Sequence, residues 1–228
     1  MAVVEFLLGR PGSGKSLAAQ YIEELLDLKT HDSRKLELPH AGSTLARDWQ
    51  VEHITDYRFL QKMFLSEGEA TGRFKATKHG GFDVVDFSIL NTVLEMVYRE
   101  VCQQLGDQSK LILVEFARDN YSDIQQIFKK IYFDAHFLYF EANIETCIQR
   151  VKTRAERRET INDNFVSEEI MREYYRADYS NVWLEGKNNK VEIIQNDGTK
   201  EEFGDKIQKF LENFLRKMES ESALLSPV

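Results

Sequence analysis

The sequence has little cysteine, and its two cysteines are not spaced as a disulfide framework or a metal site. Cys102 and Cys147 are far apart and fall in segments whose apolar spacing is typical of helices. Proteins stabilised by disulfides or by thiolate-bound zinc carry more cysteines at closer spacing. We therefore expect a reduced pair of cysteines, as is usual in a cytoplasmic protein.

Long apolar runs and an excess of positive charge are also missing. No stretch approaches the roughly 20 apolar residues of a membrane helix, and the first apolar run stops at Gly9-Arg10 without a small-residue cleavage site. The net charge of −8 excludes long-range attraction to nucleic acid, although local basic patches can still bind phosphate. We expect a cytoplasmic monomer or homodimer that acts without a membrane or a nucleic acid.

What is present is an ordinary globular composition with alternating strand and helix patterns. The 228 residues, 42% hydrophobic and 30% charged, suffice for one domain spanning 1–228. Apolar runs typical of buried parallel strands occupy 3–8, 111–116, 136–142 and 191–195, and a further strand is expected near 43–46. Helical patterns occupy 16–28, 54–65, 86–105, 121–131, 143–159, 167–179 and 200–217, while 66–83 is expected to be a long loop. This alternation predicts an α/β fold, a three-layer sandwich with right-handed crossovers.

Residues 9–16, GRPGSGKS, match the phosphate-binding pattern G-x-x-x-x-G-K-S/T between the first strand and the first helix. The glycines allow a tight ring of N–H groups around one anion, and the following helix adds its positive end. Lys15 can reach the outer phosphates, and the Ser16 hydroxyl can hold Mg²⁺. The structural alternative is a glycine-rich turn that binds no ligand. We assign nucleotide binding to Gly9, Arg10, Pro11, Gly12, Ser13, Gly14, Lys15, Ser16 and Leu17.

Other sequence features narrow the class of nucleotide-binding protein. A GTPase carries Asn-Lys-x-Asp for guanine, and the nearest stretch, GKNNKVE at 186–192, lacks the aspartate. The serine-glycine-glycine signature of transporter ATPases is absent, and the chain is short for most helicase cores. The small kinases remain as the common class with this loop.

A row of arginines follows the strand at 136–142. Arg150, Arg154 and Arg157 or Arg158 share one face of the predicted helix, because they lie about four and eight residues apart. Cations that repel one another on one face are best explained by an arriving anion, and guanidinium groups suit a phosphoryl group in transfer. The alternative is a solvated surface helix whose neighbouring glutamates balance the charge.

The last predicted strand is followed by Asn196-Asp197-Gly198 and a terminal helix. A turn at this place can pass over a purine and offer backbone groups to its edge. The alternative is a simple strand-to-helix turn with Thr199 as the N-cap, and both interpretations can hold together.

Glu115 ends a buried strand, and Arg118 follows within reach of the same crevice. Open α/β sheets bind ligands at the carboxyl ends of their strands. A carboxylate there can hold Mg²⁺ through water or accept the proton of a substrate hydroxyl. A Glu–Arg pair that braces the loop is the structural alternative.

Taken in order, these motifs resemble the P-loop nucleoside and nucleotide kinase superfamily. GRPGSGKS is similar to the adenylate-kinase form of the loop, with Pro11 in the same place, and 137–158 resembles the strand–helix–lid unit of these kinases. The segment EFAR is one residue shorter than the Asp-Gly-Phe/Tyr-Pro-Arg usual in nucleotide monophosphate kinases. The resemblance implies a five-stranded parallel sheet of order 2-3-1-4-5, ATP with Mg²⁺, and a lid at about 150–165.

We therefore predict an ATP-dependent kinase for a small-molecule acceptor, with nucleosides and nucleotides among the candidates, that docks near 40–105. The predicted catalytic residues are Lys15, Glu115, Arg118 and Arg154; the nucleotide contacts include Arg150, Arg154, Arg158, Asn196, Asp197 and Gly198; the Mg²⁺ residues are Ser16 and Glu115. Two alternatives stay open. One is a regulatory protein that binds ATP without an acceptor reaction, and the other is a kinase with a macromolecular acceptor.

Overall fold

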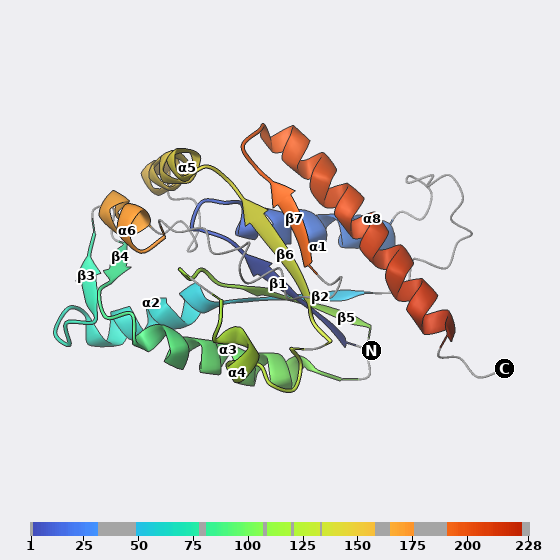
Figure 1. The fold of residues 1–228 in the computed structure, drawn as a ribbon, viewed down its shortest axis with the longest axis horizontal. Helices are drawn as coiled ribbons and strands as arrows, with labels where there is room; N and C mark the ends of the chain where they lie inside the picture. Colours follow the sequence, from blue (N-terminus) through green and yellow to red (C-terminus); the bar gives the residue numbers. More distant parts are fainter. Residues whose placement is uncertain are drawn as a thin grey trace.

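Five parallel strands form the central sheet of the molecule (Figure 1). A computed structural model describes residues 2–31, 49–77, 81–106, 109–119, 121–132, 134–157, 165–175 and 191–224. The strands are β1 (Ala2–Leu8), β2 (Gln50–Thr55), β5 (Lys110–Glu115), β6 (His136–Glu141) and β7 (Val191–Gln195). Their order across the sheet is β2-β5-β1-β6-β7. Counted along this sheet alone, that order is 2-3-1-4-5, so the predicted topology is confirmed.

Helices cover both faces of the sheet, and the sequence of β1 is apolar for that reason (Figure 1). Leu7 packs with Ile22 and Leu211 on one face, and Phe6 packs with Leu94 on the other. Full burial of one such side chain contributes roughly 1.5–3 kcal/mol. The first face is covered by α1 (Lys15–His31) and α8 (Lys200–Leu224), and the second by α3 (Ile89–Gln104) and α4 (Ile124–Ile127). The predicted three-layer α/β sandwich is confirmed.

Two predictions about 40–85 need correction. The second strand is Gln50–Thr55, where a helix was expected to begin at 54, and the expected strand at 43–46 lies outside the described residues. β2 is an edge strand with mixed polarity, so it lacks the continuous apolar run that marks a buried strand. The helix that follows, α2 (Asp56–Glu67), ends at Gly68.

The predicted loop at 66–83 contains a hairpin. β3 (Phe74–Ala76) pairs antiparallel with β4 (Phe82–Val84), and the side chains of Phe74 and Phe82 are buried against α2 and α3. Strands of three residues are too short for a periodic signal, which is why the sequence pattern missed them.

Two further helices are shorter than their predicted ranges. The helix expected at 121–131 reduces to the single turn of α4. α5 (Ile144–Arg157) matches its predicted start, and α6 (Glu168–Glu173) is shorter than predicted, with 176–179 outside the described residues.

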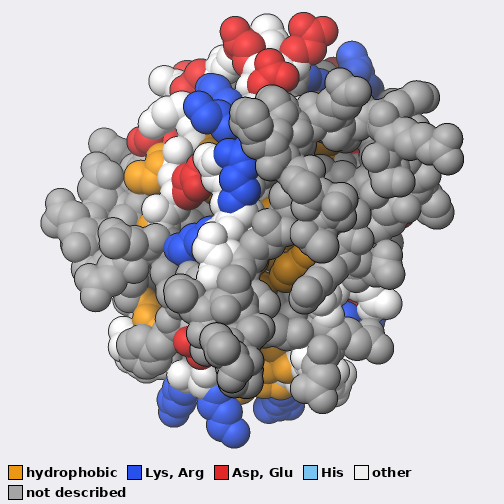
Figure 2. Space-filling model, turned by 90° about the vertical axis from the view of Figure 1, so that its right-hand side faces the viewer, with side chains coloured by type: hydrophobic (Ala, Val, Ile, Leu, Met, Phe, Trp, Pro, Cys, Tyr) orange, Lys and Arg blue, Asp and Glu red, His pale blue; other side chains and the backbone are white. Residues whose placement is uncertain are grey.

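The described surface carries charges of both signs. On the face shown in Figure 2, acidic side chains gather at the upper rim, and basic side chains lie below them and at the lower edge. Mixed charges of this kind suit a protein that stays dispersed in water. Among the described residues, no helix combines the length and apolarity needed to cross a membrane.

Candidate active site

The glycine-rich loop between β1 and α1, predicted to bind phosphate and named the phosphate-binding loop for that reason, is built around glycines with positive φ. Gly12 has φ 81° and Gly14 has φ 111°, a region that side-chain-bearing residues rarely adopt. A Cβ at Gly12 would lie 2.5 Å from the carbonyl oxygen of Cys147, and one at Gly14 would clash with the side chain of Asn196. The loop is therefore enclosed by α5 and by the turn after β7, with room for backbone only.

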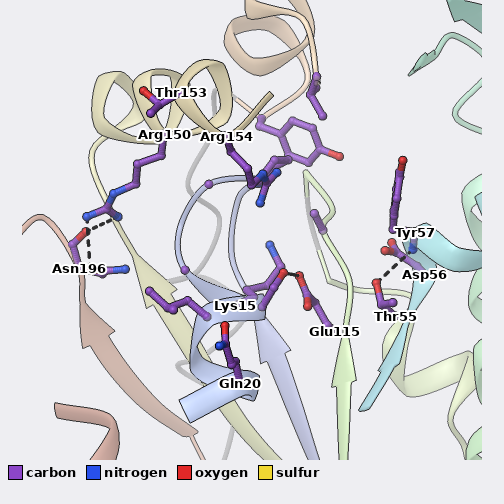
Figure 3. A pocket seen from close by; sticks show the side chains of 18 of the residues that line it. Lys15, Gln20, Thr55, Asp56, Tyr57, Glu115, Arg150, Thr153, Arg154 and Asn196 are labelled. Atoms are coloured by element: carbon purple, nitrogen blue, oxygen red, sulfur yellow. Dashed lines mark hydrogen bonds between the residues drawn. The ribbon is translucent and has the colours of Figure 1, made fainter. Parts of the chain in front are cut away.

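Lys15 folds back over this loop and is almost fully buried (Figure 3). Its Nζ donates hydrogen bonds to the carbonyl oxygens of Gly9 and Arg10, each at 2.8 Å. Burial lowers the pKa of Lys15, and the nearby carboxylates of Glu115 and Asp56 partly offset this effect. A cation is thus held at the centre of the loop, where its charge is little screened by water.

Glu115 divides its carboxylate between two partners. Ser16 Oγ donates to Oε1 at 2.8 Å, and His53 Nε2 lies 3.0 Å from Oε2. Strand register explains the second contact, because His53 pairs with Leu113 and both Leu113 and Glu115 point to the same face of the sheet. Burial alone would raise the pKa of Glu115, but the hydrogen bond from His53 and the charge of Lys15 hold it below its usual value.

Arg118 does not pair with Glu115, so the alternative of a Glu–Arg brace does not hold. Its Nη1 donates to Asp56 Oδ2 at 2.9 Å and to the Ala117 carbonyl at 2.6 Å, while Nη2 donates to the Leu90 carbonyl at 2.8 Å. The sequence reasoning missed Asp56, whose one signal is its position at the junction of β2 and α2. Burial raises the pKa of Asp56, and the charge of Arg118 partly offsets that rise.

The arginines of α5 face the cavity above the loop, but they point in different directions. Arg154 projects down toward the loop, whereas Arg150 turns toward the end of β7 (Figure 3). Nη1 of Arg150 donates to the Asn196 carbonyl at 2.8 Å. Arg157 also lines the cavity, and Arg158 lies outside the described residues. Arg154 is therefore the described arginine best placed over the loop, and a phosphate role for Arg150 would require it to leave the turn.

The turn after β7 is tied to the phosphate-binding loop. Asn196 Nδ2 donates to the Ser13 carbonyl at 2.7 Å, and Asp197 Oδ1 accepts from the Asn143 N–H at 2.8 Å. Thr199 and Glu202 form a reciprocal capping box at the start of α8, with bonds of 3.2 and 2.9 Å. The predicted N-cap is confirmed, and adenine recognition by the same turn stays a prediction.

Two contacts that the sequence did not reveal hold the loop from the other side. The phenol oxygen of Tyr121 accepts the Gly9 N–H at 2.8 Å. Arg10 donates through Nε to the Tyr175 carbonyl at 2.7 Å and through Nη1 to the Ala142 carbonyl at 3.2 Å. Arg10 therefore links the loop to the chain after α6, and these contacts direct its guanidinium away from a nucleotide role.

A single cavity of about 780 Å³ joins these elements. One half lies over the phosphate-binding loop and reaches the turn after β7. The other half lies beyond Glu115, where Thr55, Asp56 and Tyr57 project from the β2–α2 junction (Figure 3). Of the remaining predicted nucleotide contacts, the cavity wall includes Pro11, Leu17 and Gly198. Two ligands can therefore meet at Glu115 from opposite sides.

No protein-family model and no curated protein sequence matches this chain. Several solved structures match its fold over nearly the whole length. A gluconokinase from Sinorhizobium meliloti 1021 aligns with TM-score 0.56 and 11% identity over 96% of this chain and 97% of that one. Kti12 from Chaetomium thermophilum, in complex with ADP-AlF3, aligns with TM-score 0.51 and 15% identity over 92% and 97%.

The third neighbour is the APS kinase CysC from Mycobacterium tuberculosis, in complex with AMPPNP and APS. It aligns with TM-score 0.50 and 14% identity over 92% of this chain and 98% of that one. At these sequence identities the comparison shows a similarity of fold alone. The chain therefore has the fold of the P-loop kinases.

Proposed function

We propose that the protein is a kinase that transfers the γ-phosphoryl group of ATP to a small-molecule acceptor. One observation carries the proposal: the cavity over the phosphate-binding loop continues past Glu115 to the β2–α2 junction, where Thr55, Asp56 and Tyr57 line it. A protein that only binds a nucleotide needs the first half alone. The neighbouring folds support the proposal, since they include kinases, one of them in complex with a nucleotide analogue and APS together.

The residues present suit ATP with Mg²⁺. Backbone N–H groups of 9–17 and the Lys15 ammonium would hold the phosphates, and the turn 196–198 would hold the adenine edge. Ser16 Oγ and, through water, Glu115 would hold Mg²⁺, which prefers few protein oxygens together with phosphate and water. The hydrogen bond between Ser16 and Glu115 brings the two oxygens to one point, so it favours the Mg²⁺ role of Glu115 over that of base. When bound, Mg²⁺ neutralises charge on the phosphates.

Asp56 is the better candidate for the base. Asp56 lines the half of the cavity beyond Glu115, where the acceptor would bind and which we name the acceptor half. Burial raises the pKa of Asp56 toward the range in which a carboxylate accepts a proton effectively. In the proposed step an acceptor hydroxyl attacks the γ-phosphorus, its proton passes to Asp56, and the bond to the β-phosphate oxygen breaks to release ADP. Arg118 would hold Asp56 in position, and Arg154 would meet the charge that spreads over the transferred group.

The experiment that tests this proposal compares Mg-ATP binding by the wild type and by Lys15→Ala. We expect the wild type to gain thermal stability with Mg-ATP and the variant to lose most of that gain, because the Lys15 ammonium, which bonds the Gly9 and Arg10 carbonyl oxygens, would turn to the outer phosphates. Lys209→Ala, at an exposed position of α8, is the matched control and should respond as the wild type does. Equal stabilisation of Lys15→Ala and wild type would contradict the assignment of the loop.

A further inference from the structure

The acceptor half of the cavity has a largely apolar wall. Tyr57 and Phe82 are stacked with ring centroids 5.7 Å apart, and Phe87 stacks on Tyr174 at 3.9 Å. Leu60 and Leu90 belong to the same hydrophobic cluster as these rings and line the cavity. α6 and the hairpin close this half from the far side, because the Asp83 carboxylate accepts the Ser167 N–H at 2.9 Å. A ligand here meets ring faces and aliphatic side chains over most of its surface.

The floor of this half is the ion pair of Arg118 with Asp56, and the Arg118 Nε is buried without a hydrogen-bond partner among the described residues. Arg118 is buried, with a side chain only 6% exposed, and Nη1 and Nη2 donate to Asp56 and to two main-chain carbonyls. An incoming anion would have to compete with all three of these acceptors. The positive charge of Arg118 is therefore already paired with the carboxylate of Asp56 before a ligand arrives.

The carboxylates in the wall of this half also disfavour an anionic ligand. Asp83 is 7% exposed and lines the same cavity as Asp56 and Arg118. Asp56 and Asp83 adjoin the stacked rings of Tyr57 and Phe82 in the sequence and line the cavity with them, whereas Arg118 is already paired with Asp56. The partners of Glu115 are His53 and Ser16. A second anion buried beside these carboxylates would be strongly disfavoured, whereas a neutral or cationic group would not.

We infer that the acceptor is an uncharged or cationic alcohol built on an apolar or aromatic ring, an inference that rests on the proposed kinase activity. The ring packs on the faces of Tyr57 and Phe87, and the hydroxyl reaches the free edge of the Asp56 carboxylate. Acceptors that carry a phosphate or carboxylate group are excluded by Asp83 and Asp56. This selectivity would differ from that of one neighbour, the APS kinase in complex with APS, since APS is an anion.

The test is ADP release measured with acceptors in matched pairs that differ by an anionic group. The pairs are adenosine with AMP, thymidine with TMP, and glucose with glucuronate; pyridoxine and shikimate complete the panel. We expect a neutral ring alcohol to accelerate ADP release, with kcat/KM about a hundredfold above that of its anionic partner. Preference for any anionic member, or no acceleration by any neutral ring alcohol, would overturn the inference.

A charge variant tests the cause of the selectivity. Asp83→Asn keeps an oxygen for the Ser167 N–H and removes the charge, so it should reduce the discrimination within each pair by about tenfold. Asp205→Asn, at an exposed position of α8, should leave the discrimination unchanged. Unaltered discrimination in Asp83→Asn would contradict the electrostatic cause. Thermal stabilisation by Mg-ATP, measured in parallel, separates a failure of the proposed function from a failure of the inferred acceptor class. If Mg-ATP does not stabilise the protein, the proposed function is wrong. If Mg-ATP does stabilise it, the acceptor panel tests the acceptor class alone.

Discussion

At the residue scale, the carboxylate of Glu115 shows how one side chain is fixed by partners from two other elements. Ser16 at the start of α1 holds one oxygen, and His53 on β2 holds the other. With both oxygens engaged, the carboxylate has little freedom to rotate. Groups that hydrogen-bond to a carboxylate near a metal commonly set how well the metal is bound.

We therefore expect His53→Ala to weaken Mg²⁺ binding without removing a ligand. The Mg²⁺ concentration that gives half of the thermal stabilisation by ADP should rise about tenfold. His53→Gln keeps a hydrogen-bond donor on a side chain of similar reach, and it should restore most of the effect. If His53→Ala and wild type needed the same Mg²⁺ concentration, the contact with Glu115 would have no positioning role.

A second residue-scale prediction concerns Glu5, a buried carboxyl in the middle of β1. Burial raises the pKa of Glu5 well above its usual value, Glu192 adds to the rise, and Lys217 opposes it. The folded state therefore keeps a proton that the unfolded chain releases near pH 4.5. Stability is present below that pH and is lost as the pH rises toward the folded pKa, by about 1.4 kcal/mol per pH unit.

Glu5→Gln has no proton to lose, so its free energy of unfolding should lack this decline. Relative to the wild type, the variant should gain stability steadily as the pH is raised from 4.5 toward 7. Denaturant unfolding at several pH values measures the difference. Parallel pH profiles for the two proteins would show that the buried carboxyl is not the cause.

At the scale of elements, the turn between β7 and α8 joins the half of the cavity that lies over the phosphate-binding loop to the C-terminal helix. Asn196→Ala removes the donor to the Ser13 carbonyl and leaves a buried polar group unpaired, at a cost of about 1–3 kcal/mol. We expect weaker ATP binding as well, because the loop and the turn share this bond. Asn213→Ala, exposed on α8, is the control and should change stability by less than about 0.5 kcal/mol.

The elements also show which parts of the structure a sequence can predict. Strands β1, β5, β6 and β7 follow from apolar runs, and the phosphate-binding loop follows from its motif. β2 and the hairpin β3–β4 do not, because an edge strand of mixed polarity and strands of three residues carry little periodic signal. Helix limits shift where a capping residue decides them, as Gly68 does at the end of α2.

At the scale of the whole molecule, what the sequence could not predict is which distant residues meet. Arg118 was expected beside Glu115, three residues away, and instead bonds Asp56, which is 62 residues away. The strand order brings these two residues together, since β2 and β5 are neighbours in the sheet. A motif could therefore nominate candidate residues such as Lys15 and Ser16, whereas the positions of His53, Asp56 and Tyr121 depend on register and topology.

The bond from Asn196 to the Ser13 carbonyl joins residues 183 positions apart. During translation the glycine-rich loop leaves the ribosome early. Its contact with Asn196 can form only after β7 has emerged. A nascent chain that stops before β7 would expose the Gly14 side of the loop to water instead of to Asn196. Productive nucleotide capture should therefore begin late in synthesis, so that ATP stabilises finished molecules and leaves incomplete ones to quality control.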